Sequence, residues 1–60
     1  MRYTISYDIN GVRQSVAKVS YAQAVAAIQG AVAVNATNLA VVSSQGQDVT
    51  YEMTQAAVVL

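Results

Sequence analysis

Three carboxylates, Asp8, Asp48 and Glu52, are the first side chains to consider for chemistry in this chain. General acid–base catalysis needs titratable groups that converge on one pocket. If residues 48–54 form a strand, Asp48 and Glu52 share a face but stand roughly 13 Å apart, which is too far for a close pair. Asp8 is expected to pair with Arg13 instead. Since so small a chain can barely enclose a pocket of usual size, we predict no catalytic residues and no small-molecule substrate.

The absence of two residue types narrows the chemistry further. The sequence contains no Cys and no His, so it lacks thiol nucleophiles, disulfides and the commonest metal ligand and general base. Ser and Thr are plentiful, but no His is present to activate them as nucleophiles. We therefore expect neither a metal site nor a cofactor, and we predict that the protein is not an enzyme.

Four tyrosines and three basic residues raise the question of nucleic-acid binding. Stacking of bases on aromatic rings is normally combined with a positively charged groove. The net charge is zero, and strand alternation places Arg2 and Arg13 on one face but Lys18 on the other. A nucleic-acid-binding regulator that uses a polar β-ribbon, with Arg2 and Arg13 as contacts, is therefore the alternative hypothesis and not the leading one.

The elements that position these residues begin with a β-hairpin over residues 2–19. Aromatic and β-branched residues alternate with polar ones from residue 2 to residue 9, as in a half-buried strand. Asn10-Gly11 follows, and this pair favours a type I′ turn. With these two residues at the turn, Ile9 faces Val12 and Asp8 faces Arg13, which pairs opposite charges across the strands.

A helix is predicted over residues 20–35. Ser20 and Gln23 have the spacing of a capping box, and apolar residues then recur at helical spacing. Gly30 leaves two endings open, because glycine weakens a helix interior. The helix either stops at Gly30 or continues to Asn35, and we favour the longer form.

The second half of the chain predicts a further hairpin over residues 39–54 and an apolar tail over residues 55–60. Gln45-Gly46-Gln47 supplies the turn, and residues 48–54 again alternate. The expected fold is therefore α+β, in the order ββαββ, with one small domain over residues 1–60. It consists of a four-stranded antiparallel sheet with one helix packed on one face.

One helix can cover only one face of such a sheet, so we expect apolar side chains to remain exposed. Only 10% of the residues are charged, against about a quarter in a typical soluble domain. A chain of this length without disulfides or metals commonly relies on oligomerisation. Self-pairing, face to face or edge to edge, competes with closure of the tail onto the monomer's own core. The predicted interface residues are Ala17, Val19, Leu39, Val41, Val58, Val59 and Leu60.

The leading hypothesis is thus a non-enzymatic protein–protein interaction module that forms a homodimer or a larger homo-oligomer, with a protein partner also considered. Small regulatory or accessory proteins of phages and mobile elements often use two hairpins around a helix, which is an analogy of fold alone. A structural subunit of a larger assembly is the second alternative. The longest apolar stretch is too short to span a membrane, and the N-terminus does not resemble a signal peptide. We therefore expect a cytoplasmic location and no membrane partner.

Overall fold

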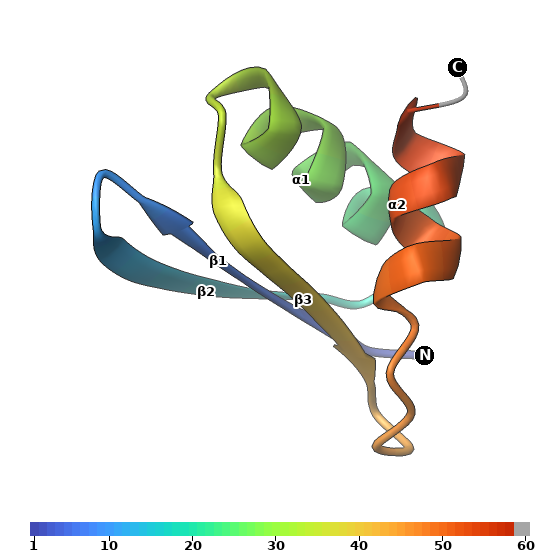
Figure 1. Ribbon diagram of the computed structural model, residues 1–60. Helices are drawn as coiled ribbons and strands as arrows, with labels where there is room; N and C mark the ends of the chain where they lie inside the picture. The colour runs from blue at the N-terminus through green and yellow to red at the C-terminus, as the bar shows by residue number, and fades with distance from the viewer. Residues whose placement is uncertain (59–60) are drawn as a thin grey trace.

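The computed structural model describes residues 1–58, which form three strands and two helices. The elements are β1 (Tyr3–Ile9), β2 (Val12–Lys18), α1 (Tyr21–Ala33), β3 (Thr37–Ser43) and α2 (Thr50–Val58). The strands form one antiparallel sheet in the order β2-β1-β3, and both helices lie on the same side of it (Figure 1). The prediction of an α+β fold is confirmed. The prediction of a four-stranded sheet with one helix is wrong, because the chain after β3 continues as a helix.

The first hairpin has the predicted register. Ile9 pairs with Val12, Asp8 with Arg13 and Ile5 with Val16. Asn10 and Gly11 both have positive φ, at 53° and 81°, as a type I′ turn requires. The turn therefore fixes which residues of β1 and β2 share a face.

Helix α1 follows the longer of the two predicted endings. The Ser20 hydroxyl accepts a hydrogen bond from the Gln23 N–H at 3.2 Å, which caps the start of the helix. At the other end Asn35 adopts φ 60°, and the Ala36 N–H donates to the Ala31 carbonyl at 3.0 Å. This is a Schellman ending with Asn in the left-handed position, so Gly30 lies inside the helix.

Strand β3 pairs with the free side of β1 and not with residues 48–54. Thr4 pairs with Val42, and a register shift between Ser6 and Asp8 marks a bulge near Asn38, whose φ is 53°. The pairing turns Val41 toward the helices, where it is fully buried, while Val42 is 40% exposed. We expected the opposite orientation, with Leu39 and Val41 on the uncovered face. That expectation was wrong because residues 39–42 are apolar at odd and even positions alike, so alternation cannot choose the face.

Residues 50–58 form α2 instead of the second strand of a hairpin followed by a tail. Met53 and Ala57 are its buried residues, and Val49 precedes them at the same four-residue spacing. The expected strand pattern placed Tyr51 under a helix, yet Tyr51 is 76% exposed. The helical conformation buries Met53 and Ala57 on one stripe, keeps the partly buried Val49 against the core and includes residues 55–58 of the predicted tail.

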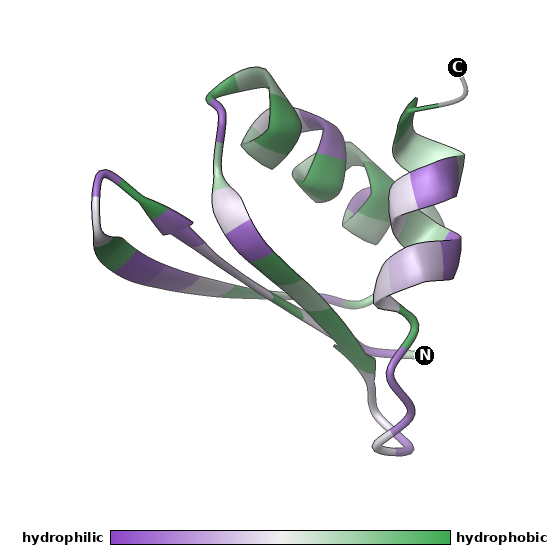
Figure 2. Cartoon of the chain, in the orientation of Figure 1, coloured by the Kyte–Doolittle hydropathy of each residue, from purple (hydrophilic) through white to green (hydrophobic). Residues whose placement is uncertain are grey.

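The core lies between the sheet and the two helices. It is small, and the sheet and both helices contribute residues to it. Figure 2 shows hydrophobic colour over most of α1, while β2 becomes hydrophilic just after the turn. The buried cluster consists of Ile5, Ala24, Ile28, Val41, Met53 and Ala57. Since both helices pack on this one face, the other face of the sheet has no cover of its own among residues 1–58.

Candidate interaction surface

Away from the Asp8–Arg13 pair next to the turn, the uncovered side of the sheet, here called the open face, consists of small side chains without charge. Cross-strand pairing places Ser6 between Ser15 and Ala40, and Thr4 between two further neighbours. A sheet that faces water normally carries larger polar or charged residues there. The residues of the open face are Thr4, Ser6, Ser15, Ala17, Ala40 and Val42.

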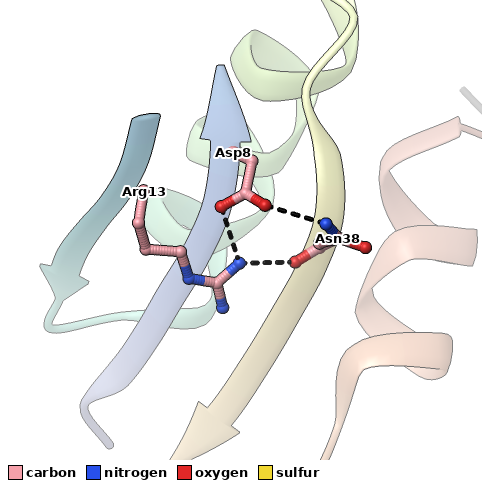
Figure 3. A network of polar contacts seen from close by, with 3 residues as sticks. All are labelled: Asp8, Arg13 and Asn38. Atoms are coloured by element: carbon pink, nitrogen blue, oxygen red, sulfur yellow. Dashed lines mark hydrogen bonds and ion pairs between the residues drawn. The ribbon is translucent and has the colours of Figure 1, made fainter. Parts of the chain in front are cut away.

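A polar network closes one end of the open face (Figure 3). Arg13 Nη1 donates to Asp8 Oδ1 at 3.2 Å and to the Asn38 carbonyl at 3.0 Å. Asn38 Nδ2 donates to Asp8 Oδ2 at 2.8 Å. The guanidinium of an edge strand thus reaches across β1 to β3. An exposed ion pair adds little stability, so the main effect of this network is to hold the Arg13 side chain over the sheet and away from the edge of β2.

The outer edge of β3 is covered by the chain that follows it. The Val41 N–H donates to Thr50 Oγ1 at 2.8 Å, and the Val41 carbonyl accepts from the Val49 N–H at 3.0 Å. The Ser43 N–H donates to the Gln47 carbonyl at 2.9 Å. These bonds occupy backbone groups of Val41 and Ser43 that a further strand would need, and covering an edge in this way hinders unwanted pairing.

The outer edge of β2 has no such cover. In a hairpin with a two-residue turn, Val12 and every second residue after it bond to β1, so the backbone groups of Arg13, Ser15 and Ala17 point outward. Within residues 1–58 these outward groups have no hydrogen-bond partner. The strand is seven residues long and contains neither a bulge nor a proline. An edge of this kind is a template for pairing with another chain.

A groove borders this free edge on the covered side of the sheet. It has a volume of about 700 Å³ and lies between α1 and the β1–β2 hairpin. Its β2 wall is formed by Val16 and Lys18, and its helix wall includes the small residues Ala26 and Gly30. The side of α1 nearest the free edge therefore carries small side chains that project little from the helix.

The predicted interface residues fall into three groups. Ala17 and Val19 are exposed at the free-edge strand and just after it, and Val58 is exposed at the end of α2. Leu39 is half-buried and packs against the core, whereas Val41 is fully buried within it. Val59 and Leu60 lie outside the described residues. Sequence reasoning did not single out Ser15, because it depended on knowing that β2 is an edge strand.

The candidate nucleic-acid contacts do not form a cluster. Arg2 precedes β1, whereas Arg13 lies next to the turn, so roughly 20 Å of strand separates them. Arg13 is paired with Asp8, and Lys18 lines the groove on the opposite face. This arrangement lacks the continuous positive surface that tracks a phosphate backbone.

The carboxylates serve local structure. Asp48 Oδ1 accepts from the Thr50 hydroxyl at 2.6 Å and from the Thr50 N–H at 3.0 Å, which fixes the start of α2. Within the part of the chain that the structure describes, no three side chains of the His, Cys, Asp or Glu types gather as a metal site would require. The hydrogen bonds from Thr50 hold the pKa of Asp48 below its ordinary value, and those from Asn38 and then Arg13 do the same for the pKa of Asp8.

Acid should therefore destabilise the fold through these two carboxylates. A lowered native pKa means that the unfolded chain binds protons more readily, so the stabilisation is complete above the ordinary value of 3.8 and is lost as the pH falls below it. We expect the urea midpoint of the wild type to drop between about pH 5 and about pH 2.5. The double variant Asp8→Asn, Asp48→Asn should show a clearly smaller drop. An equal drop in both proteins would contradict this assignment.

Two further observations complete the description. No helix within residues 1–58 is long and apolar enough to cross a membrane. Comparison with known protein families, with curated proteins and with solved structures finds no match to this chain.

Proposed function

We propose that this protein is a self-associating protein–protein interaction module that works by strand addition at β2. The proposal rests on one difference between the two edges of the sheet, namely that the following chain forms hydrogen bonds with the edge of β3 but no segment does so with the edge of β2 within residues 1–58. The chain after β3 occupies backbone groups of that strand, whereas within residues 1–58 the outward groups of Arg13, Ser15 and Ala17 on β2 have no partner. Strand addition is a common mode of peptide and protein recognition, in which main-chain hydrogen bonds supply affinity.

Composition and size support the same function. The core cluster contains six buried residues, two of which are alanines, and a domain of this length is marginal on its own. Association would bury more apolar surface beside the exposed Val12 and Val19. The net charge of zero means that two copies approach without overall repulsion.

The test is the molar mass of the wild-type chain in solution. Light scattering coupled to size exclusion should show more than the 6.3 kDa of one chain at micromolar concentration, and dilution should lower the mass toward the monomer. A folded protein that keeps the monomer mass at every concentration would contradict the proposed function.

A further inference from the structure

We propose that the partner of β2 is β2 of a second copy, paired antiparallel about a two-fold axis at Ser15, and that assembly stops at this dimer. The inference rests on the proposed function and adds the register and the size of the assembly. It follows from three features of the described residues: the outward backbone groups of β2, the charges along this strand and the covered edge of β3.

The register follows from the length of β2 and from which of its residues turn their backbone groups outward. Pairing centred on Ser15 sets Val12 opposite Lys18 of the second copy, so that all seven residues of β2 find a partner. Ser15 then faces its own counterpart, and Arg13 faces Ala17 of the second copy. These are the residues whose backbone groups point outward, so each facing pair exchanges both N–H···O=C bonds.

Charge favours this register over the one centred on Arg13. Centred on Ser15, neither Arg13 nor Lys18 lies opposite a positive residue. A shift of the axis to Arg13 would place the two arginines face to face, which is unfavourable, and it would leave part of the strand unpaired. The hydrogen bonds from Arg13 to Asp8 and Asn38 also keep its side chain clear of the incoming strand (Figure 3).

The helices are compatible with the same dimer. A two-fold axis perpendicular to the sheet keeps both pairs of helices on one face and joins the two open faces on the other. The grooves beside β2 then meet across the axis, with Ala26 and Gly30 on their helix walls. These small residues leave room for the two copies of α1 to approach each other.

Assembly should end at two copies because, within residues 1–58, β2 is the edge that the chain leaves uncovered along its length. An isologous contact uses the same patch on both chains and is closed once made. Continued growth would need the β3 edge, where Val41 and Ser43 already have partners. The expected product is a dimer with one continuous sheet of twice the three strands of the monomer.

A charge-swap experiment tests the register. Ser15→Glu and Ser15→Lys each place two like charges about 5 Å apart at the axis, so each variant alone should bind itself at least about tenfold more weakly than the wild type. An equimolar mixture should form a heterodimer. Ser15 is exposed on an edge strand, so both variants should fold, and circular dichroism verifies this.

The matched control is Thr4→Glu, which adds a charge to the open face but on the central strand. It should leave the dimer intact. Loss of the dimer in Thr4→Glu, with retention in both Ser15 variants, would overturn the inference in favour of face-to-face packing. Failure of the mixture to associate would overturn the register. A wild type that is monomeric throughout would instead contradict the proposed function itself.

Discussion

Replacing Val41 with Lys should unfold the protein, whereas replacing its neighbour Val42 with Lys should leave the fold intact. Val41 is fully buried in the cluster with Ile5, Ile28 and Met53. A lysine there would either bury its charge or lose its ammonium proton, and either outcome costs several kcal/mol. Total stabilities of small proteins are about 5–15 kcal/mol, and a chain this short belongs at the lower end.

Val42 gives the matched control because it lies one residue away on the open face. A lysine at this position can extend into water, so the change in the free energy of unfolding should stay within about 1 kcal/mol. Far-ultraviolet circular dichroism and urea titration measure both variants. A stable Val41→Lys together with an unfolded Val42→Lys would show that β3 presents the opposite face to the helices.

Replacing Thr50 with Val should open the second edge of the sheet. Thr50 Oγ1 accepts the Val41 N–H at 2.8 Å and donates to Asp48. The isosteric valine removes both bonds and leaves a part-buried N–H without a partner, which costs about 1–3 kcal/mol. The Val41 N–H then becomes available at the β3 edge in addition to the free groups of β2, and growth is no longer limited to a dimer.

The control is Thr50→Ser, which keeps the hydroxyl. We expect Thr50→Val to show species larger than a dimer in light scattering and a lower urea midpoint, while Thr50→Ser resembles the wild type. If Thr50→Val is destabilised but its mass is unchanged, the Thr50 hydroxyl stabilises α2 without protecting the edge of β3.

The parts of the fold that sequence predicted are those in which a local signal excludes alternatives. Asn10-Gly11 specifies a type I′ turn, and this turn sets the whole β1–β2 register. Ser20 and Asn35 terminate α1 through side-chain capping and a left-handed φ. Each signal acts within a few residues and does not depend on the rest of the chain.

The prediction of a strand over residues 48–54 is wrong because their pattern satisfies two periods. Val49, Tyr51 and Met53 alternate as in a strand, yet Val49, Met53 and Ala57 also recur at helical spacing. The spacing of these residues by itself does not distinguish the strand from the helix. The apolar tail was the available clue, since the helix accounts for residues that the strand leaves over.

The same error affected the candidate site. Which strand lies at an edge depends on where β3 pairs, and residues 39–42 are apolar on both faces. Leu39 and Val41 were therefore predicted as surface, whereas the free edge belongs to β2. The prediction of self-association rested partly on this assignment and partly on the low charge and the small size of the chain. It stays a prediction.

Amide hydrogen exchange, resolved by residue, tests the central claim most directly. In the dimer the N–H groups of Arg13, Ser15 and Ala17 are bonded to the second copy, while in a monomer they face water. We predict that exchange at these three amides slows as protein concentration rises, and that the amides of Val12, Gln14 and Val16, which bond to β1 in either state, change far less. Fast exchange at Arg13, Ser15 and Ala17 at every concentration would show that β2 does not pair and would contradict the account.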